Sequence, residues 1–152
     1  DRLADMQVQL KGMWVLESRQ LPDGRLIQPP LISGAFSWVP IDSRKAHVTL
    51  NVLLDKGDRF SRTFDYAAST YEVSTSAITR KRHLLIRQGY RSSAESPISD
   101  YSKAKTAKGK ISVEEEGVIK ISHERGFYQE FKGDTMIAAF PGMFTDTWKR
   151  IR

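Results

Sequence analysis

Arg62, Arg80 and Arg82 stand at positions where a β-strand would point them to the same side as its apolar residues. Phe64 follows Arg62 with this alternation, and Ile78 precedes Arg80 in the same way. Because successive side chains of a strand face opposite sides, the pattern predicts that the three guanidinium groups face the interior. A buried guanidinium needs an anion or several acceptors. The pattern therefore indicates a site for a ligand carboxylate, or else arginines at an open rim or beyond a β-bulge.

His123 is the histidine whose position favours chemistry. It ends the alternating run from Ile119 through Ile121, so it is predicted to face inward near the mouth of a barrel, where an imidazole can act as an acid or base. The same alternation places His47 and His83 on the outer surface. If the protein is an enzyme, the candidate catalytic residues are His123, Tyr66 and Arg82.

Several classes of site have no counterpart in the sequence. There are no cysteines, which excludes disulfides, thiolate metal sites and thiol nucleophiles. The histidines lack metal-ligand spacing, and the acidic run Glu114–Glu116 falls at a predicted turn. Neither a nucleophile elbow, nor a phosphate loop, nor a dinucleotide fingerprint is present. We therefore predict no metal and no cofactor.

The net charge of +6 is spread along the 152 residues rather than gathered in one stripe. Even the densest cluster, Arg80 to His83, alternates between the two faces of one predicted strand. This distribution permits an anionic ligand but argues against nucleic acid as a partner. No apolar run approaches the roughly 20 residues of a membrane span. The chain starts at Asp1 rather than at Met and has no apolar leader, which fits either a removed signal peptide or a trimmed sequence. Of the two, the expectation slightly favours an exported protein over a cytoplasmic one.

The elements that must position these side chains are almost all β-strands. Residues 1–10 form a predicted short helix with Leu3, Met6 and Leu10 on one side. The predicted strands, separated by turns containing Gly, Asp or Pro, are 14–20, 34–39, 46–54, 59–66, 71–74, 77–90, 111–115, 118–124, 127–131, 135–140 and 144–151. The polar stretch 91–110 interrupts the pattern and is predicted to be a mobile loop or lid, a short surface helix over 97–105, or disordered. With no linker or repeat, residues 1–152 form one predicted domain.

Both ends of the chain carry a motif of small closed barrels. Gly12-Met13-Trp14 opens the first strand, Pro22-Asp23-Gly24-Arg25 makes a hairpin turn, and Phe144 to Ile151 form an aromatic and basic last strand. This combination resembles the lipocalin-like barrels of the calycin superfamily. The resemblance implies an all-β, antiparallel up-and-down barrel of 8–10 strands with a short N-terminal helix. Trp14 would plug its closed end, with Trp148 or Arg150 beside it.

The resemblance implies that a small hydrophobic or amphipathic molecule, predicted here to be anionic, binds in the barrel. The alternatives are a cofactor-free isomerase or cyclase in the same cavity, an enzyme class that the resemblance implies, and a filled barrel that serves as a protein-interaction module. The predicted ligand-binding residues share inward parity around the cavity; they are Trp38, Phe60, Arg62, Phe64, Tyr66, Arg82, His123 and Gln129.

Overall fold

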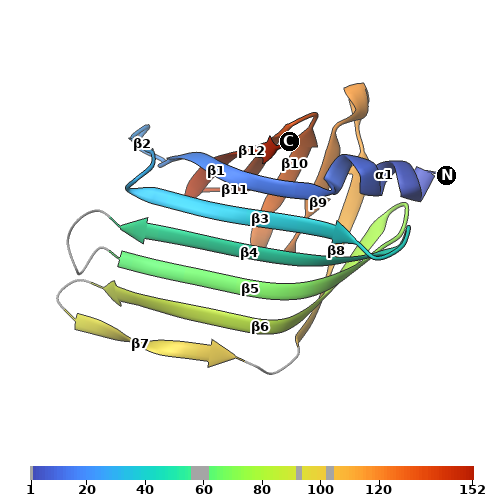
Figure 1. Cartoon of the computed structure of the whole chain (residues 1–152). Coiled ribbons are helices and arrows are strands. Elements are labelled where there is room, and N and C mark those ends of the chain that lie inside the picture. The colour runs from blue at the N-terminus through green and yellow to red at the C-terminus, as the bar shows by residue number, and fades with distance from the viewer. Residues whose placement is uncertain (1, 56–61, 92–93, 102–104) are drawn as a thin grey trace.

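The computed structural model describes the backbone of residues 2–55, 62–91, 94–101 and 105–152. One helix precedes a series of strands (Figure 1). The elements are α1 (Arg2–Leu10), β1 (Gly12–Gln20), β2 (Leu26–Ile27), β3 (Ile32–Pro40), β4 (Lys45–Asp55), β5 (Arg62–Val73), β6 (Ala77–Arg91), β7 (Ala94–Tyr101), β8 (Lys105–Val113), β9 (Ile119–Ser122), β10 (Tyr128–Lys132), β11 (Thr135–Phe140) and β12 (Phe144–Ile151).

Ten of these strands close into a barrel. The hydrogen-bonded order runs β1-β3-β4-β5-β6-β8-β9-β10-β11-β12, and β12 pairs with β1 to complete the ring. All pairings are antiparallel, while β2 and β7 are additions on β1 and β6. The prediction of an all-β, antiparallel up-and-down barrel of 8–10 strands with an N-terminal helix is confirmed. Closure satisfies the backbone groups that an open sheet would leave at its edges.

Strand β6 changes partner along its length, and this shapes the open end of the barrel. Residues 77–82 pair with β8, whereas residues 85–91 pair with β7. The β4–β7 part of the sheet therefore extends beyond the strands that face it (Figure 1). The prediction that 91–110 lacks strands is wrong, because this stretch contains β7 and the first part of β8. Its polar composition misled the prediction, since backbone pairing along β6 does not require apolar side chains.

Strand β5 is a single continuous strand, and this reverses the predicted orientation of its first half. Tyr71 and Val73 are 7% and 2% exposed, so the odd-numbered positions of β5 face inward. The prediction that Arg62, Phe64 and Tyr66 face the interior is therefore wrong. They pair across the sheet with Asp55, Leu53 and Asn51 on the outer face. Phe60, predicted to face inward with them, lies outside the described residues.

Two β-bulges also change which residues of β1 and β6 face the interior. In β1 the pairing with β12 steps from Leu16 to Ser18, so Arg19 rather than Ser18 faces inward opposite Asp146. In β6 an extra residue at His83 breaks the register against β5. Beyond it the inward side chains are Leu85 and Arg87, whereas counting every second residue on from Arg80 and Arg82 would select Leu84 and Ile86. An extra residue flips every later side chain to the other face, which period-two counting does not detect.

The closed end is filled by aromatic side chains, as predicted. Trp14 is fully buried, its ring meets Phe131 edge to face at 5.4 Å, and its Nε1 donates to the Leu10 carbonyl at 3.2 Å. The Arg150 guanidinium lies 4.6 Å from the Trp14 ring centroid, which confirms the predicted cation beside it. Helix α1 covers this end with Met6 and Leu10, both buried.

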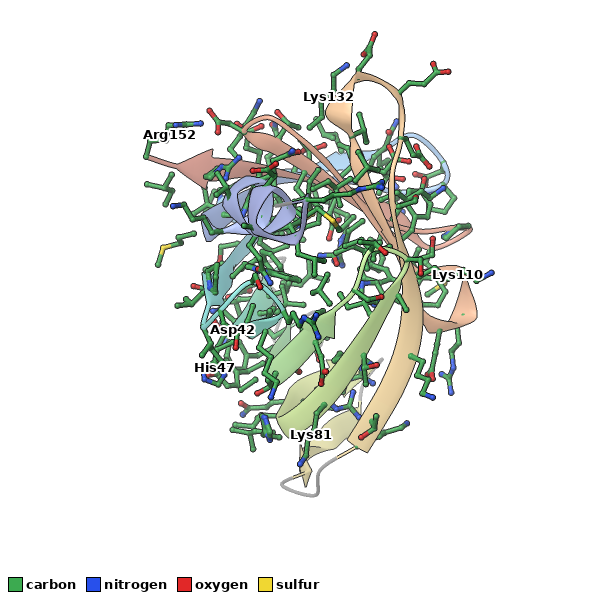
Figure 2. All side chains as sticks on the ribbon, turned by 90° about the vertical axis from the view of Figure 1, so that its right-hand side faces the viewer. Asp42, His47, Lys81, Lys110, Lys132 and Arg152 are labelled. Atoms are coloured by element: carbon green, nitrogen blue, oxygen red, sulfur yellow. The ribbon has the colours of Figure 1, made fainter. Side chains whose placement is uncertain are left out.

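The surface charge is dispersed around the barrel. Viewed from the α1 end, the labelled side chains Lys81, Lys110, Lys132 and Arg152 lie on different sides of the molecule (Figure 2). Among the described residues, no helix has the length and apolar character needed to cross a bilayer.

Candidate functional site

Two arginines of β6 face the interior of the barrel beside Tyr71, whose ring contacts Trp38 of the closed end at 5.2 Å between centroids. Arg80 pairs across the sheet with Tyr71, and Arg82 pairs with Ser69. Both partners are buried on the inner face, and directly paired residues of antiparallel strands share a face. Arg80 and Arg82 are consequently half-buried inside the barrel, as their alternation predicted.

The positive charge of these arginines is poorly compensated. Among the residues that the structure describes, no carboxylate forms an ion pair with Arg80 or Arg82. Burial lowers the pKa of Arg82, and repulsion from Arg80 and Arg87 lowers it further, while Glu124 opposes these effects. The guanidinium stays protonated at any physiological pH, so the interior keeps a net positive region.

Arg80 has hydrogen-bonding capacity left over. Its guanidinium donates to the hydroxyl of Tyr71, whose pKa is raised by burial against the opposing effect of Arg80. Its Nε is nevertheless buried without a partner, as is Nε1 of Trp148. These two are the buried side-chain polar atoms that lack a partner within the described part of the chain, and both are donors. Unpaired buried donors are rare in folded proteins, and here they fit an occupant that supplies acceptors.

His123 lies beside the arginines in a fixed orientation. Its ring lies between Tyr71 and Phe127, with centroid distances of 6.4 and 5.3 Å. Its Nε2 is 2.8 Å from Oε1 of Gln129, and since an amide oxygen only accepts, Nε2 carries the proton. Burial lowers the pKa of His123, partly offset by Gln129, and Arg80 lowers it again. Burial and Arg80 thus both favour the neutral imidazole of His123, in which Nδ1 is an acceptor.

A row of aromatic rings continues from His123 along the open rim of β9–β12. Phe127, Phe140 and Phe144 follow one another at centroid distances of 6.3 and 6.2 Å, and all three are half-buried. The row ends at Arg19, whose guanidinium lies 4.0 Å from the Phe144 centroid. Together these rings form one apolar wall of the barrel mouth.

The opposite wall comes from the inner face of β4–β6. Leu50, Val52 and Leu54 of β4 are partly buried against the core, and Leu85 of β6 is 8% exposed. Asp65 and Arg87 face the same side beyond them, 3.5 Å apart and both exposed. The exposure of these inward-facing residues marks the end of the barrel that is open to solvent.

A buried ion pair between Arg19 and Asp146 contrasts with Arg80 and Arg82, which form no ion pair with a described carboxylate. Arg19 donates two hydrogen bonds to Asp146, at 2.8 and 2.9 Å. Burial raises the pKa of Asp146 while Arg19 opposes the shift. The interior acid of β12 is thus already engaged and does not neutralise Arg80 or Arg82.

The structure brings together three of the predicted site residues, namely Arg82, His123 and Gln129. Trp38 is buried at the closed end, 1% exposed and hydrogen-bonded to Gln7 at 2.7 Å, and Tyr66 lies on the outer face. His47 and His83 are exposed on the outer face, where both contact the Thr70 hydroxyl, as predicted. Sequence reasoning missed Tyr71, whose ring lies between Trp38 and His123, and Arg19, whose guanidinium lies over Phe144 at the rim. The alternation of Tyr71 with Val73 in the sequence indicated that Tyr71 faces inward. The bulge that turns Arg19 inward has no such sign in the sequence.

No protein-family model, curated protein or solved structure matches this chain. The arguments for function therefore rest on the geometry of the barrel.

Proposed function

We propose that this protein binds a small amphipathic molecule with an anionic head group in the mouth of the barrel. The head group binds to Arg80 and Arg82, and the tail lies between the two apolar walls. The observation that carries the proposal is the pair of interior arginines without a carboxylate partner in the described part of the chain.

The head group that fits best is a carboxylate or another planar oxyanion. A guanidinium presents its donors as a rigid fork that matches two anionic oxygens. Arg80 has a buried free Nε, and Arg82 reinforces the positive potential at the same place. An anion there would supply the missing acceptor and offset the mutual repulsion of the arginines.

The tail binds by the hydrophobic effect. Its contacts are Leu50, Val52 and Leu54 on one wall and Phe127, Phe140 and Phe144 on the other. Each buried methylene contributes about 0.8 kcal/mol, so a chain of several carbons would add substantially to the ionic contact.

Membership among the lipocalin-like barrels is part of this proposal. Its support is the ten-stranded ring, the helix over the closed end, and Arg150 over Trp14. The ligand-binding role follows from the mouth and does not depend on this relationship.

The test compares fatty acids with fatty alcohols of the same chain length as competitors of anilinonaphthalene sulfonate, a fluorescent anionic amphiphile. Acids should displace the probe at lower concentration than alcohols. Arg82→Gln and Arg80→Gln should each weaken acid binding by about 10- to 100-fold, the value of one charged hydrogen bond or two. Arg62→Gln is the matched control, because this arginine lies on the outer face beside Asp55. Equal binding of acids and alcohols, or equal loss in the Arg62 variant, would contradict the proposal.

A cofactor-free isomerase or cyclase is the second candidate function, and the orientation of His123 favours it. A neutral imidazole with Nε2 held by Gln129 leaves Nδ1 able to take a proton from a substrate bound at the arginines. Tyr71, rather than the predicted Tyr66, is the phenol on the inner face. NMR of an acid identified by the displacement assay would show conversion by the wild type and none by His123→Gln. An acid that stays unchanged in both would leave binding as the function.

A further inference from the structure

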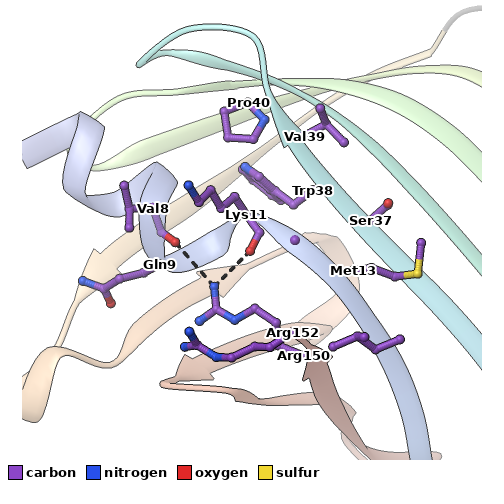
Figure 3. A pocket seen from close by; sticks show the side chains of 12 residues that line it. Val8, Gln9, Lys11, Met13, Ser37, Trp38, Val39, Pro40, Arg150 and Arg152 are labelled. Atoms are coloured by element: carbon purple, nitrogen blue, oxygen red, sulfur yellow. Dashed lines mark hydrogen bonds between the residues drawn. The ribbon is translucent and has the colours of Figure 1, made fainter.

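A hollow of about 720 Å³ lies outside the barrel at its closed end (Figure 3). It is bordered by the end of α1, the first residues of β1, the last residues of β3 and the end of β12. Of its lining residues, Trp38 reaches the interior, where its ring contacts Tyr71 at 5.2 Å between centroids. The exposed lining residues, among them Val8, Met13 and Val39, belong to the outer surface.

Four aliphatic or thioether side chains around this hollow are more than half exposed. Val8, Met13, Val39 and Ile151 are 57%, 51%, 55% and 51% exposed, and we call them the closed-end patch. Met13 pairs directly with Ile151 on β12 and with Ser37 on β3, two residues before Val39. The patch is thus continuous over three neighbouring strands and the helix. Apolar groups that gather in this way on a surface commonly mark an interaction site.

The charges around the patch are positive. Its lining includes Lys11, Arg150 and Arg152 but no acidic residue. Asp134 binds both arginines, at 3.1 Å and 2.7 Å, so the four groups carry 3 − 1 = +2. Lys11 and Arg152 are exposed at the edge of the hollow, and Arg150 is fixed by the carbonyls of Val8 and Lys11 (Figure 3).

We propose that the closed-end patch docks on the surface of an anionic lipid bilayer. Aliphatic side chains flanked by lysine and arginine combine the two interactions that hold a protein at such a surface, namely burial of apolar groups among the lipids and attraction to their charge. A second copy of the chain fits less well, because a two-fold contact would bring two groups of charge +2 together. Added β-strands are also disfavoured, since β1 is already hydrogen-bonded on both sides, by β3 and by β12.

Flotation with lipid vesicles tests the proposal. The wild type should bind vesicles of phosphatidylcholine and phosphatidylglycerol, bind phosphatidylcholine alone weakly, and dissociate as salt is raised. The double variant Val39→Ser, Ile151→Ser should lower the vesicle partition coefficient by about tenfold. Its matched control is Leu26→Ser, Met143→Ser, which changes two side chains of 56% and 60% exposure outside the patch and should bind like the wild type.

Charge variants separate the patch from the barrel mouth. Lys11→Gln should lower partitioning about fivefold. Lys81→Gln, on the outer face of β6, and Arg82→Gln, in the mouth, should leave it unchanged. Thermal unfolding of each variant should match the wild type, which shows that lost binding is not lost folding.

Three results would overturn the proposal. These are equal binding to neutral and anionic vesicles, unchanged binding of the Val39 and Ile151 variant, and a dimer in sedimentation velocity that this variant abolishes. The last result would assign the patch to a second copy of the chain.

Discussion

Arg150 at the closed end and Arg80 on the inner face of β6 are both half-buried, but their surroundings differ. Arg150 lies over the Trp14 ring, donates to Asp134 at 3.1 Å, and donates to the carbonyls of Lys11 and Gly133 at 2.9 and 2.7 Å. Arg80 has the Tyr71 hydroxyl as its partner, and its Nε is buried without one. The Arg150 guanidinium therefore joins the end of α1 and the start of β1 to the β10–β11 turn.

The contrast distinguishes a structural arginine from the pair of arginines that we propose to bind a ligand. At the closed end the cation is neutralised and its hydrogen bonds link elements that are far apart in sequence. In the mouth the cations repel each other, a cost that folding alone does not require. Proteins retain such features where a ligand or a reaction uses them.

The largest expected difference concerns the aromatic residues of the two ends. Trp14→Ala should lower the free energy of unfolding by roughly 3–5 kcal/mol, because it empties a fully packed site. Phe144→Ala at the half-buried rim should cost only about 1 kcal/mol. Urea denaturation of both variants measures the difference. Equal losses would mean that the rim is as tightly packed as the closed end.

Replacing the two arginines by methionine should have opposite effects. Arg150→Met should lower the free energy of unfolding by about 2–4 kcal/mol through lost charged hydrogen bonds and the cation–π contact. Arg80→Met should leave it unchanged or raise it by up to about 1 kcal/mol, because an uncompensated buried charge is removed. Chemical denaturation without ligand is the measurement. A comparable loss in both would show that Arg80 has a structural role and would weaken the binding proposal.

His123 should make stability depend on pH. Its pKa in the folded protein is lowered from 6.5, so the unfolded chain binds more protons as the pH falls below that value. The stability that neutral His123 contributes is complete above pH 6.5 and is lost as the pH falls toward the lowered pKa. Between about pH 7.5 and about pH 5.5 the wild type should therefore lose more stability than His123→Gln. Parallel slopes in the wild type and His123→Gln would contradict the burial of His123.

The fold could be predicted from the sequence largely because its cues are local. Alternation, turn residues and the two terminal motifs identified nearly every strand and the closed end at Trp14. Arg80 and Arg82 were assigned correctly to the interior because Ile78 lies in the same uninterrupted half of β6 and fixes its parity.

The errors arose where the face to which a side chain points depends on residues or partner strands far away in the sequence. β5 was divided into two strands, so the buried Tyr71 and Val73 were not used to orient Phe64 and Tyr66. The extra residues in β1 and β6 are visible only once the partner strand is known. Pairing partners also decide whether a polar stretch is a loop, as β7 along β6 shows.

A crystal structure of the complex with a saturated fatty acid tests the central claim most directly. The account predicts the carboxylate between Arg80 and Arg82, with one oxygen about 3 Å from Nε of Arg80, and the chain between Leu50, Val52 and Leu54 and the rim phenylalanines. A fatty acid bound outside the barrel, or one whose carboxylate points to solvent while its chain lies against the arginines, would contradict it.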